Sequence, residues 1–242
     1  MKRLLMFVTM MICMGKFAFA STPTGFLDKT MKVGENLCKY VVYVPADFNP
    51  KEKLPVILFL HGAGERGADG LKQSEVGIGR AIRFNPERYH ALVVIPQCLE
   101  GKFWANEMAD FALKALDKTI KEYKGDKNRL YLTGLSMGGF GSWGIASQHP
   151  DMFAAVVPCC GGGDPEKMAS ALINLPIWVF HGSSDGVVNV EQSRKMVKAI
   201  KDAGSSLIKY TEYEGVDHNC WDRTYGDKEM TDWLFAQTRE KK

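Results

Sequence analysis

This sequence of 242 residues has few features of non-globular proteins. It lacks low-complexity tracts, internal repeats and any apolar run near the roughly 20 residues that a membrane-spanning helix needs. Its formal net charge is only +3, and Lys2, Arg3 and Lys16 account for that excess, so the remaining chain is balanced. These absences exclude a disordered chain, a coiled coil and a polytopic membrane protein. They also give no electrostatic support for nucleic acid or an anionic membrane as a partner.

Cysteine and histidine are scarce, and their spacing does not suit a metal centre. The chain has 6 cysteines and 5 histidines, without a C-x-x-C pair or a histidine at metal-ligand distance from a cysteine. We therefore expect no structural zinc, no other metal and no cofactor. Five cysteines follow the N-terminal segment, so at least one is unpaired, and a bond between the adjacent Cys159 and Cys160 would be strained. Disulfide pairing stays open among Cys38, Cys98, Cys159, Cys160 and Cys220.

The N-terminal segment has the pattern of a secretory signal peptide. Lys2 and Arg3 precede an apolar run over residues 4–15, and Ala18-Phe19-Ala20 supplies the small residues of a cleavage site. The run is too short for a membrane anchor. We expect residues 1–20 to be a signal peptide cleaved near Ala20. Residues 21–242 would then form a single domain that is secreted or periplasmic.

Short apolar runs alternate with helical patterns along the rest of the chain. The clearest helical pattern places the apolar side chains between Met108 and Tyr123 on one face, and others begin near Gly138, Val190 and Gly226. The middle runs are almost entirely apolar, which is typical of parallel strands buried on both faces. We predict strands at residues 39–44, 56–60, 91–95, 129–133, 154–157, 177–180 and 207–213.

This alternation predicts an α/β fold with a doubly wound, mostly parallel sheet. The segment between Cys160 and Leu175 is too short for a large lid. Residues 61–89 are expected to be the longest stretch without regular structure. In such sheets ligands bind beyond the carboxyl ends of the strands, so the residues after each strand are the place to seek a site.

A G-x-S-x-G motif, Gly134-Leu135-Ser136-Met137-Gly138, lies between a predicted strand and a predicted helix. A strand-to-helix elbow exposes the serine hydroxyl, and the N-terminus of the helix offers N–H groups to developing negative charge. The motif therefore predicts Ser136 as a nucleophile. The alternative is a glycine-rich turn without chemistry.

A serine nucleophile needs a base, and the base needs an orienting acid. Only His218 among the histidines follows the last predicted strand, and Asp185 stands just past the strand at 177–180. The order Ser136, Asp185, His218 is the one that hydrolases of this fold require. Other candidates for the acid are Asp164, Asp217 and Asp222.

Neighbouring backbone and aromatic groups could complete the site. We expect an oxyanion hole built from the Met137 N–H and a second N–H from the 61–67 loop, with Ala63 first and Gly64 second. Trp104 and Trp221 could line a substrate pocket or simply pack in the core. Glu65, Arg66 and Arg80, in the long loop, are expected to form a structural ion-pair set, and the alternative is that they help to shape the binding site.

The motifs together resemble the α/β-hydrolase superfamily. They are His61-Gly62-Ala63-Gly64-Glu65-Arg66-Gly67, Pro96-Gln97-Cys98, Gly134-Leu135-Ser136-Met137-Gly138-Gly139, His181-Gly182-x-x-Asp185 and His218-Asn219-x-Trp221-Asp222. More narrowly, the chain resembles secreted bacterial carboxylesterases of the phospholipase/carboxylesterase or predicted-peptidase type, related to feruloyl and acetylxylan esterases. The resemblance covers residues 24–238. It departs from dienelactone hydrolase itself, which uses a cysteine nucleophile, and the β-propeller of prolyl oligopeptidases is absent.

The resemblance implies hydrolysis of carboxylic esters through an acyl-enzyme on Ser136. With export and an open site, it implies polysaccharide-linked acetyl or feruloyl esters as substrates, such as those of plant cell walls. Two alternatives stay open: a serine peptidase or acyltransferase on the same triad, and a catalytically silent binding module. The oligomeric state is not predicted.

Overall fold

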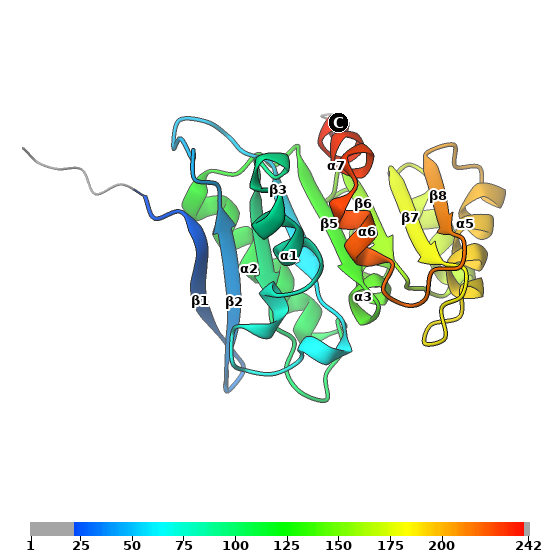
Figure 1. Ribbon diagram of the computed structural model, residues 1–242, viewed down its shortest axis with the longest axis horizontal. Helices are drawn as coiled ribbons and strands as arrows, with labels where there is room; N and C mark the ends of the chain where they lie inside the picture. Colours follow the sequence, from blue (N-terminus) through cyan, green and yellow to red (C-terminus); the bar gives the residue numbers. More distant parts are fainter. Residues whose placement is uncertain (1–21, 240–242) are drawn as a thin grey trace, which may run out of the picture.

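The computed structural model describes residues 22–239, so the expected signal peptide lies outside the described residues. Its centre is one eight-stranded sheet in the order β1-β2-β4-β3-β5-β6-β7-β8 (Figure 1). The strands are β1 (Gly25–Val33), β2 (Asn36–Val44), β3 (Val56–Leu60), β4 (Leu92–Pro96), β5 (Leu130–Leu135), β6 (Ala155–Cys159), β7 (Ile177–Gly182) and β8 (Ile208–Tyr213). All neighbours from β4 to β8 are parallel, whereas β2 runs antiparallel to β1 and β4. The prediction of a mostly parallel α/β sheet is confirmed.

Helices cover both faces of the sheet, with α2, α3 and α5 on one side and α1, α6 and α7 on the other (Figure 1). Because strands β3 to β7 are buried on both faces, each face has its own apolar core. The amphipathic pattern predicted from Met108 to Tyr123 forms α2 and buries its apolar face. The helices are α1 (Gly77–Phe84), α2 (Glu107–Tyr123), α3 (Met137–Gln148), α4 (Pro165–Met168), α5 (Glu191–Asp202), α6 (Trp221–Gly226) and α7 (Lys228–Ala236).

The register of the central strands brings their carboxyl ends to one edge. Leu60 of β3 pairs with Gly134 of β5, and Leu135 of β5 pairs with Cys159 of β6. The segments that follow these strands therefore start side by side, at the edge of the sheet where ligands bind in such folds.

Two parts of the structure differ from the sequence prediction. The edge strand β1 was not predicted, because its side chains alternate between partly buried and exposed and give no apolar run. Residues 61–89 are not structureless: they contain α1 and the short 3-10 helices η1 (Ala63–Glu65), η2 (Lys72–Ser74) and η3 (Pro86–Arg88). Helix α1 has glycines at its first and third positions, which weakens a helical signal in the sequence.

The short segment between Cys160 and Leu175 holds only α4 and the 3-10 helix η4 (Ala169–Leu172), which agrees with the absence of a large lid there. Among residues 22–239, no helix has the length and apolar character needed to cross a membrane.

Candidate active site

Ser136 occupies a strained turn between β5 and α3. Its backbone has φ 52° and ψ −117°, a conformation that non-glycine residues rarely adopt. Such strain costs on the order of 1–3 kcal/mol and persists only where the surrounding structure enforces it. Hydrogen bonds enforce it here, because the Ser136 N–H donates to the carbonyl of Cys159 and the Ser136 carbonyl accepts from Phe140. The turn leaves the serine partly exposed at the start of the helix.

The glycines of the motif are required by close backbone contacts. A Cβ added to Gly138 would lie 1.9 Å from the carbonyl oxygen of Leu60, and one added to Gly134 would lie 2.4 Å from that of Gly138. Neither approach is possible for a larger residue, since the obstructing atoms belong to the backbone. Glycine at these two positions lets α3 start directly against the end of β3.

Ser136, His218 and Asp185 form one hydrogen-bonded chain. The Oγ of Ser136 lies 2.9 Å from Nε2 of His218, and Nδ1 of His218 lies 2.7 Å from Oδ2 of Asp185. A carboxylate only accepts hydrogen bonds, so Nδ1 carries the proton and Nε2 is left as the acceptor for the serine hydroxyl. This arrangement can remove the hydroxyl proton while a nucleophilic oxygen forms.

The carboxylate of Asp185 is fully buried and holds several partners besides His218. Its Oδ1 accepts from the backbone N–H groups of Val187 and Val188, each at 2.8 Å. Burial by itself raises the pKa of Asp185, but hydrogen bonds from His218 and from these two amides outweigh it and leave the pKa below its ordinary value. The group therefore remains an anion at neutral pH and can orient His218.

His181 is a further partner of Asp185. Its Nε2 lies 3.1 Å from Oδ2 of Asp185 and 2.9 Å from the carbonyl of Val188, and both of these atoms are acceptors, so Nε2 carries a proton. Its Nδ1 lies 2.8 Å from Oγ of Ser193. His181 lies at the end of β7, where the sequence gives no sign of which residue its ring contacts. The tertiary structure identifies that partner as Asp185.

The other acids considered from the sequence bond elsewhere. Asp164 caps α4 and contacts Lys167. Asp217 accepts from the backbone N–H groups of Gly186 and His218, and Asp222 contacts Asn219. Among the described residues, the carboxylate that hydrogen-bonds to the His218 ring is that of Asp185, not one of these three.

The 61–67 loop lies beside the serine. A Cβ on Gly62 would stand 3.7 Å from Cβ of Ser136, which places the next residue, Ala63, close to this serine. Ala63 is the first residue of η1 and Met137 is the first residue of α3. First-turn N–H groups have no partner within their own helix, so both can donate to a bound anion. Gly64, the second choice, is the next residue of η1.

Buried His61 holds this loop in place. Its Nε2 accepts from the Cys98 N–H at 2.9 Å, so its Nδ1 carries the proton and lies 2.6 Å from the carbonyl of Gly62. The indole N–H of Trp104 donates to the carbonyl of His61 at 2.9 Å. Burial lowers the pKa of His61 to about 4, because the charged ring would lose its hydration.

His61 should make the protein sensitive to acid. Its pKa in the folded protein is below that of an unfolded histidine, near 6.5, so its contribution is fully present above that value and is lost as the pH falls toward 4. The loss should reach about 3 kcal/mol of unfolding free energy. Urea unfolding of the wild type and His61→Gln at pH 7 and pH 4 measures it. Between pH 7 and pH 4, the unfolding free energy of the wild type should fall by about 3 kcal/mol more than that of the variant. Equal decreases would contradict the lowered pKa of His61.

The remaining sequence candidates lie in different surroundings. Trp104 is 4% exposed and packs edge-on against His61, so it supports the loop from within the core. Trp221 is partly buried, with its ring centroid 5.2 Å from that of His218 and nearly perpendicular to it. It remains the aromatic candidate next to the triad.

The expected ion-pair set of Glu65, Arg66 and Arg80 is not formed, since the ion pairs found within residues 22–239 include none among these three. Arg66 donates to the carbonyl of Lys102 and stacks on Phe103, and Arg80 stacks on Phe84. Cationic side chains gain from aromatic faces as well as from acids, which sequence spacing cannot distinguish.

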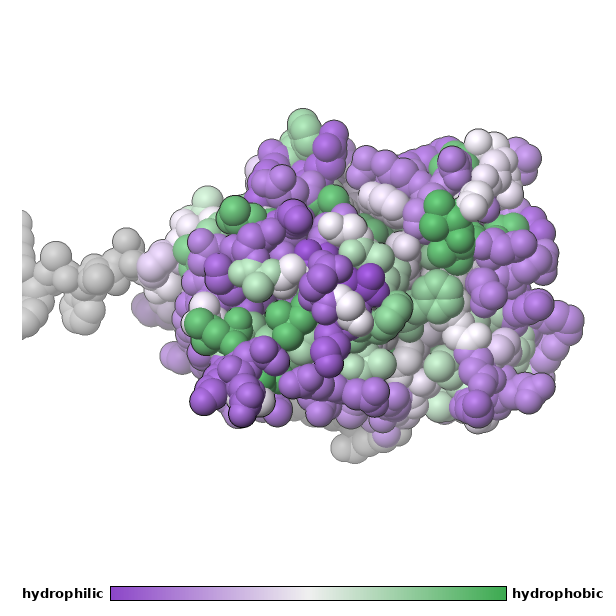
Figure 2. Space-filling view, turned by 90° about the horizontal axis from the view of Figure 1, so that it is seen from below, coloured by the Kyte–Doolittle hydropathy of each residue, from purple (hydrophilic) through white to green (hydrophobic). Residues whose placement is uncertain are grey.

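The face at the carboxyl ends of the parallel strands is apolar across its middle. Figure 2 views this face and shows apolar and neutral residues gathered between hydrophilic residues on either side. Phe140, one turn after Ser136, is 40% exposed, and Val187, two residues after Asp185, is 72% exposed. Exposed apolar groups beside a polar triad are typical of a site for a partly apolar ligand.

The chain is similar to proteins of one enzyme family. The dienelactone hydrolase family matches residues 93–229, more than half of the chain. A bifunctional acetylxylan esterase/xylanase from Neocallimastix patriciarum is 35% identical over 167 residues, which cover 66% of this chain and 23% of that protein. Feruloyl esterase D from Neurospora crassa is 23% identical, over 65% of this chain and 57% of that protein.

A solved structure of a thermostable esterase has a TM-score of 0.80 and 38% identity, and the match covers 88% of this chain and 63% of the other. This chain thus spans between about a quarter and about two thirds of the relatives that it matches. The predicted α/β-hydrolase resemblance is confirmed: the chain belongs to the dienelactone hydrolase family, with an α/β-hydrolase fold.

Proposed function

We propose that the protein is a secreted serine esterase that hydrolyses carboxylic esters through an acyl-enzyme on Ser136. The observation that carries the proposal is the chain of hydrogen bonds from Ser136 through His218 to buried Asp185. The esterase names among the relatives support the same reaction. Export is supported by the signal-peptide pattern of residues 1–20.

The proposed reaction has two halves. As the Ser136 oxygen attacks the ester carbonyl carbon, Nε2 of His218 takes the hydroxyl proton, and Asp185 stabilises the imidazolium that forms. The oxyanion would accept hydrogen bonds from the N–H groups of Met137 and Ala63. His218 then gives its proton to the departing alcohol, leaving the acyl group on Ser136. In the second half, His218 takes a proton from a water molecule as the water oxygen attacks the acyl carbon. The bond from the acyl carbon to the Ser136 oxygen then breaks, and His218 returns the proton to that oxygen as the acid leaves.

Acetyl and feruloyl esters of polysaccharides are the substrate class that we propose. The names of two relatives include acetylxylan and feruloyl esters. The absence of a long segment between Cys160 and Leu175 supports access for a bulky alcohol, and Trp221, Phe140 and Val187 offer apolar contacts for an acyl group. An aromatic acyl group can contact these three side chains over a larger apolar area than an acetyl group can.

Two esters with different acyl groups test this proposal. The mature protein should hydrolyse p-nitrophenyl acetate and methyl ferulate, and the Ser136→Ala variant gives the blank for both. If Trp221 contacts the aromatic acid, Trp221→Ala should lower kcat/KM for methyl ferulate about tenfold more than for p-nitrophenyl acetate. Acetate turnover alone would restrict the activity to short acyl groups. Equal silence of both proteins would contradict the esterase and favour a peptidase or a binding module.

A further inference from the structure

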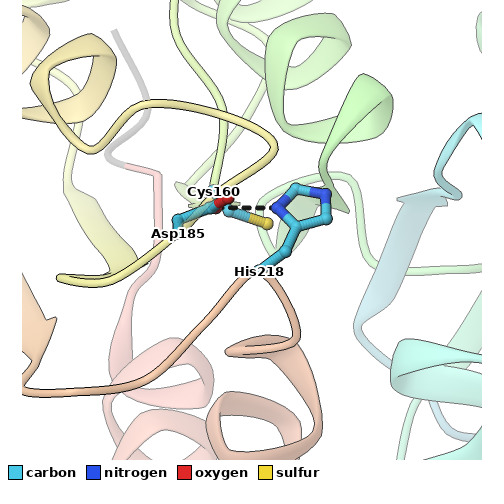
Figure 3. A group of neighbouring side chains, drawn as sticks. All are labelled: Cys160, Asp185 and His218. Atoms are coloured by element: carbon cyan, nitrogen blue, oxygen red, sulfur yellow. Dashed lines mark hydrogen bonds and ion pairs between the residues drawn. The ribbon is translucent and has the colours of Figure 1, made fainter.

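Cys160 lies directly against the proposed triad but has no part in the proposed reaction. It follows β6, and its side chain is fully buried. One ligand atom each of Cys160, Asp185 and His218 lies within 4.8 Å of the other two. Figure 3 shows the three side chains converging from separate loops, with the sulfur turned toward the hydrogen bond between Asp185 and His218.

The fold holds the sulfur in this place. Cys160 has φ 40°, in the region that favours glycine, although it carries a side chain. Its N–H donates to the carbonyl of Phe180 at 2.8 Å, which ties it to the end of β7. A strained residue persists only where its surroundings enforce it, so the sulfur is positioned by the strand ends that also position Ser136 and Asp185.

A thiolate, an imidazole and a carboxylate are together the ligand set of a borderline-soft divalent cation. Zn²⁺ binds sulfur at about 2.3 Å and nitrogen or oxygen at about 2.0–2.2 Å in tetrahedral geometry, so ligand atoms within 4.8 Å of one another need to shift by about an ångström to share it. Mg²⁺ and Ca²⁺ prefer oxygen ligands and gain little from a thiolate. The side chains of Asp185 and Cys160 are both buried. The Asp185 carboxylate therefore has no water shell to lose when a cation binds to it.

We propose that Cys160, Asp185 and His218 form an inhibitory binding site for Zn²⁺ and similar cations. Binding forms bonds from the cation to the Cys160 sulfur, the His218 nitrogen and the Asp185 oxygen. The thiol proton is released to solvent, and the proton of the neutral His218 ring moves from Nδ1 to Nε2, so that Nε2 no longer accepts from Ser136. No electron transfer occurs. Inhibition rests on the proposed function, because a cation bound to His218 and Asp185 would stop them from activating Ser136. Binding of the cation does not depend on the proposed function.

Binding is tested directly with Cd²⁺, whose bond to a thiolate gives a charge-transfer absorption in the ultraviolet. In a non-thiol reductant, titration of the whole protein should give this band with a stoichiometry near one. Cys160→Ser and His218→Ala should each weaken binding at least about tenfold. Cys38→Ala, which removes a buried cysteine on β2, should bind as the wild type does. No band in the wild type, or an equal band in Cys160→Ser, would overturn the proposal.

Cys220 distinguishes this site from a two-cysteine site. The Cys160 and Cys220 thiols interact, but Cys220 does not belong to the three-residue group. Cys220→Ala should retain the Cd²⁺ band. If the Cd²⁺ band is lost in Cys220→Ala but retained in His218→Ala, the cation binds to the two thiols of Cys160 and Cys220, and the proposed site is wrong.

Ester hydrolysis then tests inhibition, with each protein compared with its own metal-free rate. Zn²⁺ should inhibit the wild type, and the inhibiting concentration should rise at least about tenfold in Cys160→Ser. Mg²⁺ should not inhibit either protein. Equal inhibition of both proteins by Zn²⁺ would overturn the proposal. A Cd²⁺ band in a protein without esterase activity would refute the proposed function and leave the metal site standing.

Discussion

Replacement of Ser136 by alanine should lower the turnover of any substrate ester by about 10⁴-fold or more. The variant keeps the backbone turn and removes only the oxygen that His218 contacts. The residual rate would come from water attack in a site that still binds the ester and its oxyanion. Initial rates with p-nitrophenyl acetate measure the effect, and a fluorophosphonate should label the wild type but not the variant.

Ser147→Ala is the matched control for this prediction. Ser147 lies on the same helix, and its hydroxyl bonds only the carbonyl of Gly144 among the contacts found. Its replacement should leave turnover and labelling within a factor of about three, since exposed or half-buried substitutions away from a site have small effects. If Ser136→Ala keeps more than a tenth of the wild-type rate, Ser136 is not the nucleophile.

Replacement of Asp185 by asparagine should lower kcat by roughly 10³ to 10⁴-fold, the size of effect seen where such a carboxylate orients a catalytic histidine. Asparagine removes the charge that stabilises the imidazolium. Its amide group can also face Nδ1 of His218 and favour the tautomer in which Nε2 carries the proton. That tautomer cannot accept the proton of Ser136. Steady-state kinetics on a chromogenic ester give the loss, and thermal unfolding reports whether the variant remains folded.

Asp217→Asn separates this role from a general effect of charge. Asp217 adjoins His218 in the sequence, and its carboxylate accepts hydrogen bonds from the backbone N–H groups of Gly186 and His218. Its replacement should change kcat less than about tenfold. A larger loss in Asp217→Asn than in Asp185→Asn would reverse the assignment of the acid. Comparable small losses in both would show that neither orients the base.

As the pH falls, Asp185 should stay ionised to a lower pH than an ordinary aspartate. Hydrogen bonds from His218, Val188 and Val187 outweigh burial and hold its pKa below the usual value, so the folded state binds its proton less readily than the unfolded state. Its stabilising effect is therefore present above the ordinary pKa of an aspartate and is lost as the pH falls through the lowered one. His61 acts in the higher range, between about 6.5 and about 4, so the two contributions are lost in different pH windows.

Buried strands and the serine motif were readable from the sequence because their signals are local. Strands β3 to β7 are continuous apolar runs bounded by glycine or polar residues, and α2 repeats its apolar positions at a helical period. Strand β1 was missed because an edge strand buries only part of one face. Helix α1 was missed because its glycines oppose helix formation and its stability comes from packing under the sheet.

The sequence alone determined the alternation of strands and helices, the elbow at Ser136 and the chain order Ser136, Asp185, His218. Each of these depends on neighbouring residues or on order along the chain. Only the tertiary structure decided which acid faces His218, that His181 contacts that acid, and that Trp104 lies beneath the loop. It also placed Cys160, Asp185 and His218, which come from three separate loops, close together. Residue spacing along the sequence cannot reveal this proximity. Contacts between distant segments depend on strand order and register, which are set by packing of the whole sheet and not by any one segment.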